Sequence, residues 1–273
     1  MRSTAAVLGS PIHHSLSPII HNLAYKQLGI EREYIAVEIK ENEFLDWIRP
    51  ALTETNQWFG FSLTMPLKEV VCDESLSDII QLDALSKTIN SANTLYLKEG
   101  QWQGCSTDVI GFQNLLKGIE FSSVSILGAG GTARAALGAL STAPQFSQVR
   151  VYRRDSKRDS SLIRAGRNQK LEIHPWSDLD AGDKHDLVIN TVPNIGVAEI
   201  AEKFSGARTL LDAIYSPWPT ALMKRQQQDG MAIISGLELL CAQAVPQIEL
   251  MTGISFDHAA LFKLALEELH KYV

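Results

Sequence analysis

The sequence predicts an α/β protein of two domains, each built on a mostly parallel sheet. Short apolar runs alternate with helical stretches along the chain, which indicates parallel strands covered by helices. A glycine-rich turn, Gly128-Ala129-Gly130-Gly131, follows one apolar run in mid-chain, as it does in nucleotide-binding folds. The length of 273 residues is enough for two ordinary domains.

The first hundred residues carry the elements of the first domain. Pro18 suits the first turn of a helix that ends before Gly29, and Lys98-Glu99-Gly100 supplies a hairpin turn. The expected elements are strands at 5–8, 33–39 and 59–64, helices at 18–28, within 41–50 and after Pro66, and a hairpin of 94–97 with 100–104.

The second domain repeats the alternation around the glycine-rich turn. A connecting helix at 109–116 precedes it, and the expected strands are 123–127, 149–152, 186–190, 209–212 and 232–234. Two helical segments, 237–250 and 258–272, end the chain and are expected to pack back on the first domain. The predicted boundaries are therefore 1–108 with 238–273 returning to it, and 109–237 for the nucleotide-binding domain.

Composition limits the classes of protein that remain. The chain is 45% apolar and 21% charged, as expected of a globular protein, and its net charge of -6 argues against nucleic-acid binding. No apolar run approaches the roughly 18–20 residues of a membrane helix. Its three scattered cysteines and seven histidines match neither a disulfide framework nor a metal spacing. We therefore expect a cytoplasmic protein without a metal.

Two serines, Ser15 and Ser17, stand directly before Pro18. The first turn of a helix exposes unpaired N–H groups and a partial positive charge, so two hydroxyls there can seat a small carboxylate. The alternative interpretation is that Ser17 only caps the helix and Ser15 lies in a turn.

The glycine-rich turn fits the G-x-G-x-x-A form of the dinucleotide fingerprint, with Ala133 keeping helix and strand close. The next strand runs into Arg153 and Arg154, with Lys157 and Arg158 behind, and no carboxylate stands at its end. Arginine suits a phosphate by its bidentate geometry, which favours NADP(H) over NAD. A solvated basic turn is the alternative, and Asp155 weakens the phosphate interpretation.

Lys68 stands at an expected helix start, where its charge opposes the helix dipole. A residue set against its local preference indicates a function, although an ordinary surface lysine is the alternative. Asp108 opens the connecting helix and could be a plain cap.

Six motifs in order resemble the shikimate dehydrogenase family: GSPIHHSLSPIIHN, SLTMPLK, SANT, STDVIGF, GAGGTAR and ISGLELLCAQA. The resemblance covers Leu8 to about Gly253. It implies an N-terminal substrate domain, a Rossmann NADP-binding domain and an active site in the cleft between them. It also implies the reversible NADPH-dependent reduction of 3-dehydroshikimate to shikimate, a step of chorismate and aromatic amino-acid biosynthesis.

The resemblance also assigns site residues by position. Lys68 and Asp108 are the catalytic pair, and Ser15 with Ser17 binds the substrate carboxylate. The remaining substrate contacts come from Thr64, Asn93, Asp108 and Gln243, with Tyr215 nearby. The pyrophosphate lies on Gly128, Ala129, Gly130, Gly131 and Thr132, the 2′-phosphate among Arg153, Arg154 and Arg158, and the nicotinamide end near Thr191, Ala213 and Gly236.

The chain departs from the family pattern at several positions. Ser62 and Ser106 stand where asparagine is common, so one amide contact to the substrate at Ser62 is expected to be lost or replaced by water. Arg153 replaces an asparagine of the phosphate loop, and Glu238 replaces an apolar residue for no reason evident in the sequence. A quinate/shikimate dehydrogenase of broader scope and a non-catalytic NADP-binding regulator remain alternatives. The expected partners are a small-molecule substrate and, for assembly, either none or a second copy of the chain.

Overall fold

The computed structural model describes residues 3–54, 57–142, 148–179, 185–193, 196–197, 201, 204 and 206–273. The chain divides into two compact units. Unit 1 comprises Met1–Ile110 and Cys241–Tyr272, and unit 2 comprises Gly111–Leu240 with Val273. Each unit contains one six-stranded sheet.

The sheet of unit 1 has the strand order β2-β1-β3-β5-β6-β4. Its strands are β1 (Thr4–Gly9), β2 (Glu33–Glu38), β3 (Trp58–Leu63), β4 (Ile80–Leu82), β5 (Thr94–Lys98) and β6 (Gln101–Cys105). Three pairs are parallel, β1 with β2, β1 with β3, and β4 with β6. The pairs of β5 with β3 and with β6 are antiparallel. The expected hairpin is confirmed, and Glu99 and Gly100 at its turn have φ of 52° and 82°.

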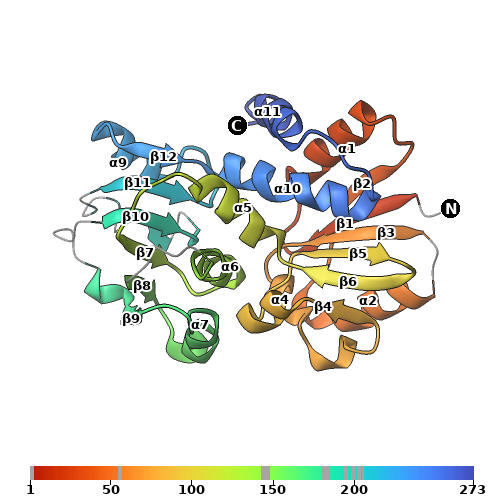
Figure 1. Cartoon of the computed structure of the whole chain (residues 1–273), viewed down its shortest axis with the longest axis horizontal. Helices are drawn as coiled ribbons and strands as arrows, with labels where there is room; N and C mark the ends of the chain where they lie inside the picture. The colour runs from red at the N-terminus through yellow and green to blue at the C-terminus, as the bar shows by residue number, and fades with distance from the viewer. Residues whose placement is uncertain are drawn as a thin grey trace. The chain divides into compact units, whose positions relative to one another are not determined.

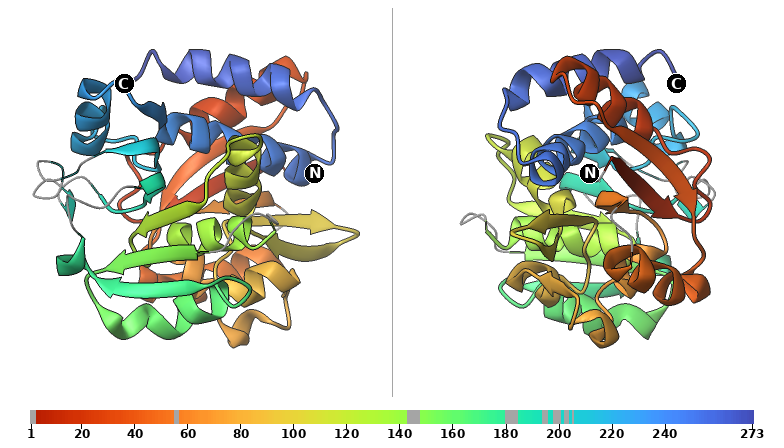
Figure 2. Two further views of the ribbon diagram at one scale, coloured as in Figure 1. Left: turned by 60° about the vertical axis from the view of Figure 1, so that its left-hand side comes forward. Right: turned by 90° about the vertical axis from the view of Figure 1, so that its right-hand side faces the viewer.

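Helices cover both faces of this sheet (Figure 1). Helix α2 (Phe44–Thr53) lies on one face, while α1 (Ser17–Gln27) and α11 (His258–Leu269) pack together on the other. Both views of Figure 2 keep α11, in violet-blue, next to α1, in red. The expected return of the C-terminal helices to the first domain is therefore confirmed. The shorter helical elements of unit 1 are η1 (Glu41–Glu43), α3 (Leu67–Val70), η2 (Glu74–Leu76) and α4 (Ala84–Ile89).

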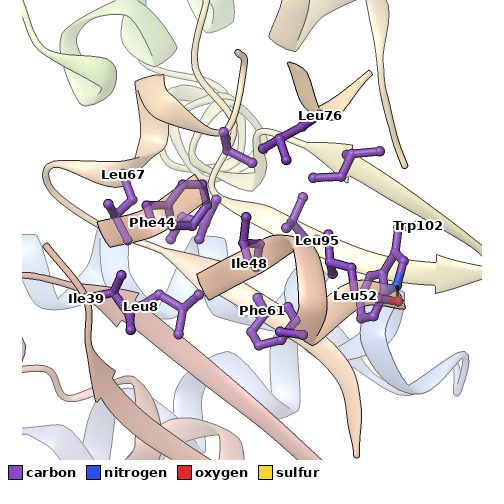
Figure 3. Close-up of a cluster of buried hydrophobic side chains, with 14 of the residues drawn as sticks. Leu8, Ile39, Phe44, Ile48, Leu52, Phe61, Leu67, Leu76, Leu95 and Trp102 are labelled. Carbon is purple, nitrogen blue, oxygen red and sulfur yellow. Dashed lines mark hydrogen bonds between the residues drawn. The ribbon is translucent and has the colours of Figure 1, made fainter. Parts of the chain in front are cut away.

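The apolar core under α2 explains why this helix runs past the expected end at 50. Phe44, Ile48 and Leu52 recur every four residues and face one way, toward Leu8 and Phe61 of the sheet (Figure 3). Phe44 and Ile48 are fully buried. Since this stripe continues to Leu52, the helix continues to Thr53 with Pro50 inside it.

The sheet of unit 2 has the order β12-β11-β10-β7-β8-β9, and all its pairs are parallel. Its strands are β7 (Ser123–Leu127), β8 (Gln148–Arg153), β9 (Leu171–Pro175), β10 (His185–Asn190), β11 (Ala207–Asp212) and β12 (Ala232–Ile234). Numbered within the unit, the order reads 6-5-4-1-2-3, which is the doubly wound order of dinucleotide-binding folds. The α/β fold with a Rossmann-type second sheet is confirmed.

Ligands of such sheets bind where the strand order reverses, beyond the carboxyl ends of the strands. In unit 2 this point lies between β7 and β10, whose last residues, Leu127 and Asn190, are register partners. Helix α6 (Gly131–Leu140) begins directly beyond β7, and η3 (Ser156–Arg158) and α7 (Asp159–Ala165) follow β8. Among the described residues, the unit also contains η4 (Trp176–Asp178) and α9 (Ala221–Gln228).

Two helices run from one unit into the other along the chain, α5 (Thr107–Leu116) and α10 (Gly236–Thr252). The start of α10 explains the unexpected Glu238. Its carboxylate accepts hydrogen bonds from the backbone N–H and the hydroxyl of Ser235, at 2.7 and 2.8 Å, and the N–H of Glu238 donates to the Ser235 hydroxyl. This reciprocal arrangement is a capping box, which an apolar side chain could not form.

Candidate active site

The ammonium group of Lys68 and the carboxylate of Asp108 lie in contact in unit 1. Lys68 Nζ donates to Asp108 Oδ2 at 2.5 Å. The side chain of Lys68 is 16% exposed and that of Asp108 is 6% exposed, so the pair is largely buried while the lysine keeps some contact with solvent. Asp108 occupies the first turn of α5, where the helix dipole favours its negative charge. Lys68 lies in the single turn of α3.

Asn93 holds the second oxygen of Asp108. Its Nδ2 donates to Asp108 Oδ1 at 3.0 Å and to Gln243 Oε1 at 3.1 Å. Its Oδ1 accepts from the backbone N–H of Thr107 at 2.7 Å. Because a backbone N–H can only donate, this bond fixes which end of the amide faces Asp108. A buried ion pair needs such added hydrogen bonds to satisfy its remaining lone pairs.

Backbone pairing brings these segments together. The N–H of Ala92 donates to the carbonyl of Lys68 at 2.9 Å, and the N–H of Asn93 donates to the carbonyl of Cys105. The SANT segment is thereby clamped between α3 and the end of β6. The structure thus unites four of the residues expected at the site, Lys68, Asn93, Asp108 and Gln243.

Three polar residues of this cluster were missed at the sequence level. The hydroxyls of Thr94 and Thr107 lie 2.9 Å apart, and both threonines are fully buried. They belong to the SANT and STD motifs, in which the resemblance assigns roles only to the neighbouring Asn93 and Asp108. Gln247 donates to Thr94 Oγ1 at 3.0 Å. Its only signal is its place one helical turn after Gln243.

Ser15 and Ser17 lie at the start of α1, close to each other. The backbone N–H of Ser17 donates to Ser15 Oγ at 3.4 Å. The interpretation of Ser17 as the helix cap is wrong, because Leu16 occupies that position and no side chain caps α1. Thr64 lies against Gly9, so closely that a Cβ on Gly9 would overlap Thr64 Cγ2. The substrate contacts of these residues stay predictions.

In unit 2, the glycine-rich turn is shaped for the close approach of a ligand. Gly128 has φ of +114°, and a Cβ there would overlap Thr191 Oγ1. That hydroxyl is fixed by donation to the carbonyl of Leu127 at 2.7 Å. Helix α6 begins at Gly131, so the N–H groups of its first turn lie beside the backbone of Gly128 to Gly130. This cradle fits the pyrophosphate of a dinucleotide.

A buried carboxylate, Asp212, organises the neighbouring strand ends. It accepts hydrogen bonds from Asn190 Nδ2 at 2.9 Å, from the N–H of Ile214 at 3.1 Å and from the hydroxyl of Thr220. Burial raises the pKa of Asp212. The carboxylate secures the segment that carries Ala213 and Tyr215. A Cβ on Gly236 would lie 2.7 Å from the Ile214 carbonyl, so Gly236 packs on the same segment.

The arginines at the end of β8 and directly after it differ in their contacts. Arg153 makes a bidentate ion pair with Asp159, with Nε–Oδ1 and Nη2–Oδ2 distances of 2.8 and 2.7 Å. The guanidinium of Arg153 holds the pKa of Asp159 below its ordinary value. Arg154 and Arg158 are exposed. A Cβ on Gly130 would lie 3.8 Å from Arg158 Nη1, which places this guanidinium at the glycine-rich turn.

Within the described ranges, no group of three or more His, Cys, Asp and Glu side chains could hold a metal ion. No helix in the same ranges is long and apolar enough to cross a bilayer. Cys72, Cys105 and Cys241 form no disulfide. Burial raises the pKa of the Cys105 thiol to about 12, so this cysteine is not an activated nucleophile.

The doubly wound sheet with its phosphate cradle, together with the buried lysine–carboxylate pair, defines a dinucleotide-dependent α/β oxidoreductase. The family model described as the shikimate dehydrogenase substrate binding domain matches residues 7–95. The chain is 32% identical to the shikimate dehydrogenase (NADP(+)) of Pyrobaculum aerophilum, over 97% of this chain and 98% of that protein. It is 30% identical to the shikimate dehydrogenase of Sulfurisphaera tokodaii, over 92% and 90%.

Solved structures agree with these relatives. The Mycobacterium tuberculosis shikimate dehydrogenase superposes with a TM-score of 0.83 at 31% identity, covering 98% of this chain and all of the other. A Thermus thermophilus shikimate 5-dehydrogenase, solved in complex with shikimate, gives a TM-score of 0.78 at 27% identity, with coverage of 98% and 99%. The chain belongs to the shikimate dehydrogenase family.

Proposed function

We propose that this chain catalyses the reversible NADPH-dependent reduction of 3-dehydroshikimate to shikimate. The contact between Lys68 and Asp108 in a member of this family carries the proposal. In this assignment residues 1–108 and 238–273 bind the substrate, and residues 109–237 bind NADPH. The non-catalytic regulator is disfavoured, because such a protein has no need to keep this pair.

The chemistry follows from the charges at the pair. When bound, NADPH supplies the hydride. Reduction of the ketone places negative charge on its oxygen, which the ammonium group of Lys68 stabilises and then protonates. Asp108 keeps the ammonium in position through the 2.5 Å contact and accepts a hydrogen bond from a substrate hydroxyl. In the oxidation direction, Lys68 accepts the proton of the alcohol.

Substrate recognition is assigned to hydroxyl and amide groups of unit 1. Ser15 and Ser17 bind the carboxylate, and Thr64, Asn93 and Gln243 bind the ring hydroxyls and carboxylate. Both Nδ2 hydrogens of Asn93 are used by Asp108 and Gln243. A substrate that contacts this amide must therefore take the place of one of these two acceptors. Tyr215 is proposed as a further substrate contact.

The nucleotide is assigned to the carboxyl edge of the unit 2 sheet. The backbone of residues 128–132 holds the pyrophosphate, while Thr191, Ala213 and Gly236 lie at the nicotinamide end. The 2′-phosphate is held by Arg154 and Arg158. Arg153 is proposed as the third arginine around the 2′-phosphate, although its guanidinium is also paired with Asp159.

Replacement of Arg158 tests the phosphate assignment. Arg158→Ala is expected to raise the KM for NADP by about tenfold or more, because a charge-assisted hydrogen bond to phosphate contributes about 1.5–3 kcal/mol. The KM for NAD, which lacks this phosphate, is expected to stay unchanged. Initial rates at varied NADP and NAD measure both values. Arg208→Ala is the control, since Arg208 is an exposed arginine at the opposite end of a strand in the same unit. Equal effects of Arg158→Ala on the two cofactors would contradict the assignment.

The activity itself is tested by following the absorbance of reduced nicotinamide with shikimate or quinate and with NADP or NAD. We expect turnover of shikimate with NADP and little with NAD. Turnover of quinate at a comparable rate would identify the enzyme of broader scope. Binding of NADPH without turnover of either acid would instead indicate a regulator.

We further propose a cytoplasmic location and a monomer or homodimer as the assembly. Cysteines that form no disulfide, as here, are typical of a reducing compartment. Sedimentation of the purified protein determines the assembly.

A further inference from the structure

Helix α10 runs along strand β3 on one face of the unit 1 sheet, with one helical turn for every two strand residues. Gly60 and Ser62 lie two apart on β3 and point to the same face. A Cβ on Gly60 would overlap the side chain of Met251, and Ser62 Oγ donates to Gln247 Oε1 at 3.0 Å. Four residues of a helix rise about 6 Å and two residues of a strand about 6.6 Å. This match lets successive helical turns contact successive inward positions of the strand.

A continuous chain of hydrogen bonds starts from this contact. Tyr34 Oη donates to Ser62 Oγ at 2.6 Å, and Ser62 Oγ donates to Gln247 Oε1. Gln247 Nε2 donates to the backbone carbonyl of Asn93 at 3.2 Å and to Thr94 Oγ1 at 3.0 Å. Tyr34, Ser62 and Gln247 are 1%, 4% and 1% exposed, so these bonds are shielded from water.

The direction of every bond in this chain is determined. The Asn93 carbonyl can only accept, so the NH₂ end of Gln247 must face it and the oxygen end must face Ser62. Ser62 therefore has to donate its single proton to Gln247. The tyrosine hydroxyl must then donate to Ser62. Each group is consequently held in one orientation by the next.

Two uncharged groups, Tyr34 and the neighbouring His21, lie at the end of the hydrogen-bond chain away from Asn93. The ring of His21 stacks on that of Tyr34 with centroids 3.8 Å apart. Burial lowers the pKa of His21 to about 3, and burial raises the pKa of Tyr34 well above its ordinary value. Neither group changes charge near neutral pH. The chain therefore acts through position and not through proton transfer.

We propose that Tyr34, Ser62 and Gln247 are positioning residues that hold Asn93 in the orientation in which it binds Asp108. Asn93 is fixed at two points, by Gln247 at its carbonyl and by the Thr107 N–H at its side chain. Its amide then fixes the carboxylate that contacts Lys68. At position 62 the amide contact to substrate is expected to be lost, and the only proton of Ser62 is instead used by Gln247. The inference rests on the proposed function for its kinetic consequence alone.

Two buried tyrosines of unit 1 provide a matched test. Tyr34→Phe removes the hydroxyl that donates to Ser62. Tyr25→Phe removes an equally buried hydroxyl, which lies 3.4 Å from His21 Nδ1. Tyr34→Phe is expected to lower kcat for shikimate oxidation about threefold to tenfold with KM little changed, as the loss of one positioning hydrogen bond would. Tyr25→Phe is expected to leave kcat unchanged.

A second readout does not depend on turnover. The side-chain amide resonances of Asn93, observed by ¹⁵N NMR, are expected to shift in Tyr34→Phe and to keep their positions in Tyr25→Phe. Ser62→Ala and Ser62→Thr serve if Tyr34→Phe does not fold. The alanine is expected to act like Tyr34→Phe, and the threonine, which keeps the hydroxyl, to restore kcat.

The outcomes separate this inference from the proposed function. If the native protein turns over shikimate while Tyr34→Phe and Tyr25→Phe have the same kcat and the same Asn93 resonances, the positioning role is wrong. If the native protein does not turn over shikimate, the proposed function is wrong, and the Asn93 resonances alone decide whether the chain positions that amide.

Discussion

Lys68→Ala is expected to lower kcat for shikimate oxidation by about 10²–10⁴-fold, the range of a general acid or base. The variant loses both the charge that stabilises the alkoxide and the group that exchanges a proton with it. KM is expected to change much less, because the carboxylate and the ring hydroxyls of the substrate are assigned to other residues. Steady-state rates at saturating NADP measure the two parameters separately.

Lys87→Ala provides the control for the lost charge. Lys87 is an exposed lysine of the same unit, in the last turn of α4. It is expected to keep the native kcat and KM. A Lys68→Ala enzyme with native kcat would remove Lys68 from the chemistry, and a rise in KM alone would limit it to substrate binding.

Gly128→Ala is expected to lose most of the affinity for NADPH and to unfold at a lower temperature. Gly128 has φ of +114°, a conformation that is strained for alanine, and the added Cβ would overlap the fixed hydroxyl of Thr191. Relief of this overlap must move the glycine-rich turn or the end of β10, and both border the proposed dinucleotide site. We expect affinity to fall by at least about tenfold, which corresponds to about 1.4 kcal/mol.

Gly118→Ala is the control that separates the effect of steric overlap in Gly128→Ala from the effect of backbone strain. Gly118 lies in the same unit with φ of +83°, but nothing lies within 4 Å of a Cβ there. Both variants are expected to carry backbone strain of about 1–3 kcal/mol. Only Gly128→Ala also places its Cβ against the Thr191 hydroxyl. Thermal unfolding and titration of NADPH by its fluorescence measure the two effects. An unchanged NADPH affinity in Gly128→Ala would separate this turn from the dinucleotide.

Elements with strong apolar patterns could be predicted from the sequence, and weakly apolar ones could not. Ser123–Leu127 and Ala232–Ile234 are found at the predicted bounds. Leu171–Pro175 was missed because it is an edge strand with alternating polar residues and half-buried side chains. Ala221–Gln228 was missed because Lys-Arg-Gln-Gln-Gln dominates its sequence and only Leu222, Met223 and Gln226 are buried. Long-range packing, and not local propensity, decides such segments.

The residues of the site likewise fall into those that the sequence could predict and those that it could not. Lys68 and Asp108 could be paired in advance because both belong to motifs with an implied role. The ion pair of Arg153 with Asp159 could not, since arginine next to a phosphate site suggests the phosphate as its partner. Gln247 could not be recognised either, because its importance comes from hydrogen bonds to residues more than 150 positions away along the chain. Such contacts are visible only once α10 lies on β3.

The pairing of Lys68 with Asp108 is tested most directly by a double-mutant cycle on kcat/KM for shikimate. The cycle compares Lys68→Ala, Asp108→Asn and the double variant with the native enzyme. Residues that act as one unit lose little more together than the more damaging change loses alone. We predict that the double variant retains about the activity of Lys68→Ala. A double variant whose loss equals the product of the two single losses would show that the two residues act independently, contrary to this account.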